Sequence, residues 1–138
     1  MSARTLRFAL FPLESWHSQA FVVWSCDSDQ LSEWIEERWG VHWSKHDGWR
    51  GLFIPSNEID EVEGKPTFIL ALRQWSGSIQ DVALLAHECY HATQYLHKLL
   101  ADSEWHGVEE DAARLMERLI VGCLDALHGT RDLDQGAD

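Results

Sequence analysis

The chain has 138 residues, which is the size of one domain with a substantial hydrophobic core. Hydrophobic residues make up 45% of the chain and charged residues 25%, a composition typical of globular proteins in water. The formal net charge of -12 argues against nucleic acid as the main partner, because Lys and Arg side chains must neutralise its phosphates.

The cysteines and the N-terminus bear on where the protein works. The three cysteines (Cys26, Cys89 and Cys123) are widely spaced and form no CxxC pair. This pattern favours reduced thiols in the cytoplasm over a disulfide framework or a zinc ribbon. The apolar run at the N-terminus is interrupted by Pro12 and Glu14, which is not typical of a signal peptide. No apolar stretch approaches a membrane-spanning length, so we expect no membrane partner.

The first part of the chain predicts strands and one helix. Residues 4–11 and 20–25 are apolar runs typical of strands, and Pro12 is expected in the turn between them. Seven of the eight tryptophans precede residue 76, so we expect an aromatic-rich core or sheet face in this half. A helix is predicted over about residues 29–39, where apolar residues recur at helical spacing. Asp27 or Ser28 is expected to cap this helix, and Gly40 to end it.

The next segments predict two more strands. Residues 50–54 are expected to form a third strand, and the acidic run over 58–64 a surface loop. Residues 67–73 (TFILALR) carry the strongest strand signal of the chain, which ends at Ser76-Gly77-Ser78.

Two helices are expected to complete the domain. The first covers about residues 79–99, and the second begins at Asp102 or Ser103 and ends near residue 127. The second helix has a predicted packing face formed by Leu115, Leu119, Gly122, Cys123 and Ala126. We therefore predict one α+β domain over residues 1–128, with strands and one helix first and a helix pair last. Residues 129–138 are expected to form a polar tail.

A helical histidine pair is the most informative pattern in the sequence. His87-Glu88-Cys89-Tyr90-His91 places two imidazoles one turn apart on one helix face, where both can reach one ion. Neutral imidazole nitrogens suit Zn²⁺. Glu88 is one step around the helix, where its carboxylate can act on a water molecule at the metal. The apolar neighbours Leu84, Leu85, Ala86 and Ala92 predict a semi-buried site.

Several residues are candidates for the third zinc ligand. If the two last helices pair around a turn near residues 100–102, Glu110 or its neighbour Glu109 comes level with His91. His106, which is followed by Gly107, is a second candidate. His97 has the spacing of a third histidine in H-E-x-x-H-x-x-G-x-x-H. However, Gln94 replaces the glycine that would turn the chain, so we expect the helix to continue and His97 to point elsewhere.

The segment around this motif resembles the zincin metallopeptidases, and in particular the gluzincin pattern of H-E-x-x-H followed by a helix with E-x-x-A. The second element here is Glu110-Asp111-Ala112-Ala113, and Glu109 fits it one residue out of register. The following Arg114-Leu115 makes this helix similar to small phage- and prophage-encoded metallopeptidases. The resemblance is clearest over residues 67–120. It implies a zincin-like fold, Zn²⁺ held by His87, His91 and Glu110, and Glu88 as the general base.

The resemblance also implies supporting roles. In zincins, the strand before the metal helix often lies at the sheet edge and holds an extended substrate, and residues 67–73 would be that strand. Catalysis needs a donor to the developing oxyanion, for which Tyr90, Tyr95 and His106 are all available. Asp111 and Asp125 are candidates for orienting a ligand histidine.

We therefore predict a zinc metallopeptidase that acts on a peptide or protein substrate. One alternative is a binding protein that uses zinc for stability without catalysis. Another is an acidic interaction or inhibitor protein that mimics nucleic acid, which would carry carboxylates on one face and bind no metal.

Overall fold

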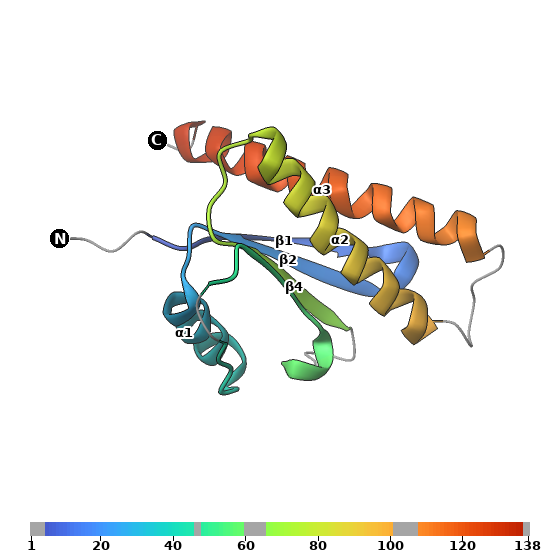
Figure 1. The fold of residues 1–138 in the computed structure, drawn as a ribbon, viewed down its shortest axis with the longest axis horizontal. Helices are drawn as coiled ribbons and strands as arrows, with labels where there is room; N and C mark the ends of the chain where they lie inside the picture. Colours follow the sequence, from blue (N-terminus) through green and yellow to red (C-terminus); the bar gives the residue numbers. More distant parts are fainter. Residues whose placement is uncertain (1–4, 46–47, 60–65, 101–107, 137–138) are drawn as a thin grey trace.

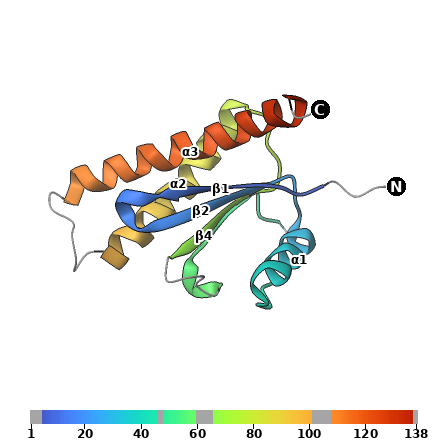
Figure 2. The same cartoon turned by 180° about the vertical axis from the view of Figure 1, so that it is seen from behind.

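The chain folds as a mixed sheet between two helical layers (Figure 1). The computed structural model describes residues 5–45, 48–59, 66–100 and 108–136. Helix α1 packs on one face of the sheet, while α2 and α3 cover the other (Figures 1 and 2). The predicted α+β class, with strands and one helix before a terminal helix pair, is confirmed.

The sheet has four strands in the order β1-β2-β4-β3. Their bounds are Arg7–Leu13 for β1, Ser18–Trp24 for β2, Gly51–Ile54 for β3 and Thr67–Leu72 for β4. Strand β1 is antiparallel to β2, β2 is parallel to β4, and β3 is antiparallel to β4. Every side chain of β4 is buried, because this strand is paired on both sides and covered on both faces. The edges are therefore β1 and β3.

The turn after β1 differs from its expected place. Strand β1 continues through Pro12 to Leu13, and a 3-10 turn over Glu14–Trp16 connects it to β2. A proline is tolerated here because β1 is an edge strand, where the missing N–H removes no ladder bond. The carbonyl of Pro12 accepts a hydrogen bond from Arg118 at 3.3 Å.

Helix α1 (Ser28–Trp39) begins and ends as predicted. The Asp27 carboxylate accepts a hydrogen bond from the Gln30 N–H, and the Gln30 side chain accepts one from the Asp27 N–H. This reciprocal pair satisfies amides at the helix start that have no partner within the helix. Gly40 ends the helix in the left-handed conformation, with φ of 70°.

An aromatic cluster lies between α1 and the sheet, which confirms the expected aromatic face. The rings of Phe8, Phe21, Trp34 and Trp39 contact one another with centroids 5.1–6.2 Å apart. The Arg38 guanidinium stacks over three of these rings. Such contacts add cation–π attraction to the burial of apolar area.

Helices α2 (Ile79–Leu100) and α3 (Val108–Gly136) run antiparallel on the opposite face (Figure 1). The start of α2 is fixed by Asp81, whose N–H donates to Ser78 and whose carboxylate accepts from the N–H and hydroxyl of Ser76. The expected start of the second helix at residues 102–103 lies outside the described residues. Helix α3 continues through residues 129–136, which the sequence assigned to a polar C-terminal tail.

The predicted packing face of α3 is confirmed. Leu115, Leu119 and Cys123 are fully buried against the sheet and α2. Cys123 lies beside Cys89 of α2, and the hydrogen bond between the thiols, together with burial, raises the pKa of Cys123 well above its ordinary value. Within the described ranges, no helix has both the length and the apolar character needed to cross a bilayer.

At Gly122, α3 packs closely on β1. A Cβ at this position would lie 2.6 Å from the Phe11 ring. We expect Gly122→Ala to lower the free energy of unfolding by about 1–3 kcal/mol, because the buried ring has to shift. Urea unfolding monitored by circular dichroism measures the change.

Gly129 on the same helix provides the matched control. A Cβ there meets nothing within 4 Å, so Gly129→Ala should stabilise the helix by up to about 1 kcal/mol. Equal stability of the two variants would contradict the described packing of α3 on β1.

Candidate metal site

His87 and His91 converge on one point outside α2. Their Nε2 atoms are 3.2 Å apart, and the rings are nearly perpendicular, with an interplanar angle of 82°. Two nitrogens bound to one tetrahedral zinc at about 2.0–2.1 Å would be separated by about 3.3 Å. The observed separation therefore fits a shared zinc ion. It also fits a hydrogen bond between one protonated and one unprotonated ring nitrogen.

The packing of α2 directs these two rings toward solvent. Leu85, Cys89 and Leu96 on the opposite side of the helix are fully buried against the sheet. Both His87 and His91 are exposed, so the expectation of a semi-buried histidine pair is wrong. The apolar residues around the motif, which suggested that the pair is buried, lie on the side of α2 that faces the sheet or next to that side.

Glu88 lies between the histidine face and the sheet. Its side chain is only 6% exposed, and it packs against Gly51 at the start of β3. A Cβ at Gly51 would lie 3.2 Å from the Glu88 Cγ, so the glycine permits this close approach. Burial raises the pKa of Glu88, while the nearby positive charges of His87, His91 and Lys45 oppose the rise.

The edge strand beside α2 is β3, whereas the sequence pointed to residues 67–73 as the edge strand. These residues form β4, which is paired on both sides and has no free edge. Strand β3 is an edge strand and contacts α2 through Gly51. A central strand that is buried on both faces is apolar along its whole length, which makes it easy to recognise in a sequence. The most recognisable strand of this chain was therefore a central strand and not an edge strand.

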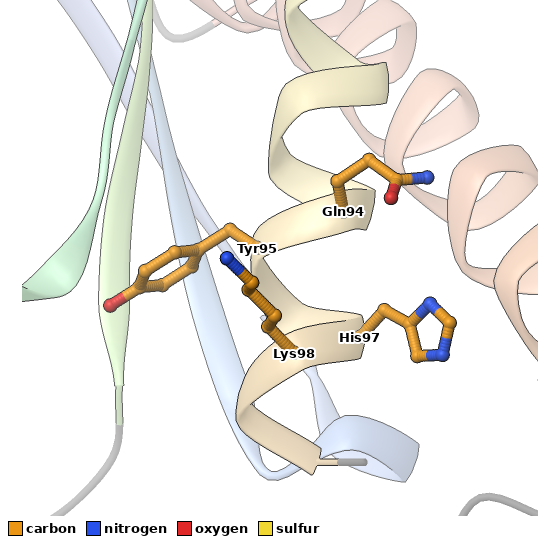
Figure 3. Close-up of a pocket in the computed structure, with 4 residues that line it drawn as sticks. All are labelled: Gln94, Tyr95, His97 and Lys98. Carbon is orange, nitrogen blue, oxygen red and sulfur yellow. The ribbon is translucent and has the colours of Figure 1, made fainter.

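A pocket of about 520 Å³ lies toward the C-terminal end of α2. Its lining residues are Gln94, Tyr95, His97 and Lys98 (Figure 3). Gln94 and Lys98 follow His91 by three and seven residues, so they continue the same helix face. The exposed face of α2 therefore carries both the histidine pair and a hollow beside it.

The structure does not bring Glu110 to the histidine pair. The Glu110 side chain is 69% exposed and forms an ion pair with Arg114 at 3.3 Å. Cys89 and Cys123 are opposite each other. Glu110 precedes Cys123 by 13 residues and His91 follows Cys89 by 2, so the offset is 11 residues, or about 16 Å along the helices. Among the described residues, no group of three His, Cys, Asp or Glu side chains is placed to bind a metal.

Of the other third-ligand candidates, His97 is the one whose side chain the structure describes. Helix α2 runs through Gln94 without a break, as expected, and His97 projects toward α3 on the side away from Tyr95 (Figure 3). His106 and the side chain of Glu109 lie outside what the structure describes.

Two tyrosines on α2 have different surroundings. The Tyr95 hydroxyl is 2.6 Å from the Ser56 hydroxyl, and its ring packs on Phe53 of β3. Tyr95 thus joins α2 to the sheet edge. Tyr90 is 53% exposed, and so is a surface residue of α2. Asp111 and Asp125 lie on α3, and within the described residues neither contacts His87 or His91.

Comparisons with known proteins add no family assignment. No protein-family model, curated protein or solved structure matches the chain.

The chemistry of the site is defined by the side chains of α2 and by their neighbours in β3 and in the segment that precedes β3. Gly51 and Lys45 are two of these neighbours that the motif did not indicate. A glycine at the start of a predicted strand can mark the close approach of another element, and this signal could have indicated Gly51.

We expect Glu110→Gln to bind zinc as tightly as the parent protein, because the described Glu110 carboxylate pairs with Arg114. Competition with a chromogenic zinc chelator measures the affinity. A loss as large as that of His91→Ala would contradict this arrangement, and would support the third-ligand role that the sequence suggests for Glu110.

Proposed function

We propose that the protein is a zinc-dependent peptidase whose metal is held by His87 and His91. The observation that carries the proposal is the 3.2 Å separation of the two Nε2 atoms on an exposed helix face. Glu110 stays the sequence-based candidate for a third ligand. When bound, zinc polarises a carbonyl oxygen and lowers the pKa of a coordinated water to about 7.

Glu88 supplies the acid–base chemistry in this proposal. It accepts a proton from the attacking water and later donates that proton to the nitrogen of the leaving amine. Its side chain is fixed against Gly51 by packing, and no described residue forms a hydrogen bond with it. A carboxylate held in place with no hydrogen bond to a described residue is free to bind and move a proton.

The surroundings of the pair have room for an extended peptide. Strand β3 is an edge of the sheet, so one side of its backbone has no strand partner within the described sheet. Main-chain groups at such an edge can hydrogen-bond to a peptide in extended conformation. The pocket formed by Gln94, Tyr95, His97 and Lys98 gives space for a substrate side chain.

The zincin resemblance and the cytoplasmic location are part of this proposal. The exposed His87 and His91 pair on α2, with Glu88 buried between it and the edge strand β3, supports the first. The second is supported by Cys26, Cys89 and Cys123, which are free thiols buried in the core. Burial is the main cause that raises the pKa of Cys26 to about 12, so this thiol is unreactive in the folded protein.

We expect Glu88→Gln to retain zinc and to lose hydrolysis by about 10²–10⁴-fold, the usual contribution of a general base. The glutamine preserves the shape of the side chain against Gly51 but cannot accept the proton. Cleavage of an internally quenched peptide pool by zinc-loaded protein measures the rate. Full activity of the variant would refute the role of Glu88.

We expect His91→Ala to lose bound zinc, while the parent protein holds about one ion per chain. Elemental analysis after dialysis at equal free zinc measures the stoichiometry. Because His91 is exposed, the variant should fold normally, which circular dichroism can verify.

Two outcomes favour the alternatives. Zinc bound tightly by a protein that cleaves no peptide indicates a zinc-stabilised binding protein. No zinc in either the parent or the variant indicates an acidic interaction protein and excludes the metal site.

A further inference from the structure

The exposed side of α2 around the histidine pair carries no charged side chain. Between Asp81 and Lys98, a segment that the structure describes throughout, the one charged residue is Glu88, and it is buried. The exposed positions of this segment are Val82, Ala83, His87, Tyr90, His91 and Gln94. A stretch of equal length on α3, residues 110–125, includes six charged residues. An uncharged exposed face, in a chain of which 25% is charged, is typical of the core of a protein–protein contact.

The histidine pair on this face supplies only part of a zinc site. Zinc is usually bound by four ligands in tetrahedral geometry. The Nε2 atoms of His87 and His91 are 3.2 Å apart, which fits two of those positions. Among the described residues, no third metal-binding side chain joins the pair. Because both histidines are exposed, the remaining positions are open to groups from outside the chain.

We propose that a second copy of the chain completes this site, so that one zinc ion joins two copies through His87 and His91 of each. This inference rests on the proposed zinc binding by the histidine pair and goes beyond the peptidase activity. A contact of this kind is symmetric, because each copy presents the same pair to the other. Four imidazoles around one ion then satisfy its tetrahedral coordination.

Zinc controls this association because the two copies repel each other without it. Each chain has a net charge of -12, so copies without metal stay apart. The uncharged face of α2 keeps the local repulsion low where the copies meet, and the zinc ion adds positive charge at that point. Tyr90, which is 53% exposed and lies between the two histidines in the sequence, adds aromatic area to the contact.

The bridge has a consequence for the proposed peptidase. A zinc ion with four protein ligands has no position for a water molecule, whereas a catalytic zinc ion keeps one position open. The bridged dimer is therefore an inactive form. One ion serves two chains, so the dimer prevails when zinc is scarcer than protein. With zinc in excess, each chain binds an ion of its own and the copies separate.

Sedimentation velocity at a series of zinc-to-chain ratios tests the bridge without any substrate. At about 50 μM chain, the protein should have the mass of one chain in EDTA and of two chains at a ratio of about 0.5. It should return toward the mass of one chain at about a tenfold excess of zinc, where the dimer is titrated away. Elemental analysis of the separated dimer should find about one ion per two chains.

Two histidine variants on the same helix identify the residues of the bridge. His91→Ala should stay monomeric at every ratio, because each copy then offers a single ligand. His97→Ala is the matched control and should still dimerise, because His97 projects toward α3 (Figure 3). Zinc-bound parent protein that is monomeric at every ratio would overturn the bridge. So would a dimer that persists in EDTA, a dimer that His91→Ala retains, or loss of the dimer in His97→Ala.

Hydrolysis over the same zinc series distinguishes the bridge from the proposed peptidase. The rate per chain should stay low up to a ratio of about 0.5 and should rise beyond it, as chains with their own ion accumulate. A monomer whose rate rises in proportion to zinc from the first addition would retain the peptidase and refute the bridge. A zinc-dependent dimer without hydrolysis at any ratio would retain the bridge and refute the peptidase.

Discussion

The packing of the apolar side of α2 on the sheet determines the arrangement of the whole site. Leu85, Cys89, Ala92 and Leu96 are fully buried, so the helix cannot rotate about its axis without exposing them to water. Losing the burial of one such leucine costs about 2–5 kcal/mol. That fixed rotation directs the imidazoles outward and turns the neighbouring carboxylate toward β3. The site is thus positioned by residues that take no part in its chemistry.

The buried and exposed sides of α2 are linked by the sequence itself. Cys89 lies within the His-Glu-x-x-His motif, yet it belongs to the core and contacts Cys123 of α3. One turn of α2 therefore has two roles. Its inward residue, Cys89, anchors α2 to α3, and its outward residues, His87 and His91, form the histidine pair. A bulkier residue at Cys89 would displace both helices and, through them, the two rings.

Local patterns were predictable from the sequence, and non-local pairings were not. The helical period of about 100° per residue places His87, His91 and Glu88 relative to one another, and the capping residues Asp27 and Gly40 set the ends of α1. Strand order depends on contacts between distant segments, so the edge position of β3 did not follow from its short apolar run. The position of Glu110 along α3 relative to His91 also depends on a non-local contact, the one between Cys89 and Cys123. An estimate based only on how far each residue lies from the turn between the two helices could not include this contact.

The two edge strands of the sheet differ in how readily they can pair with an additional strand. At β1, Pro12 lacks an N–H, and the side chain of Arg118 occupies its carbonyl, so an incoming strand would find this ladder interrupted. At β3 no proline interrupts the strand, whose sequence is GLFI. Growth of the sheet by one strand is thereby steered toward the side that carries the histidines. The same asymmetry guards against open-ended stacking of copies through paired edges, because such a chain of molecules requires both edges to be receptive.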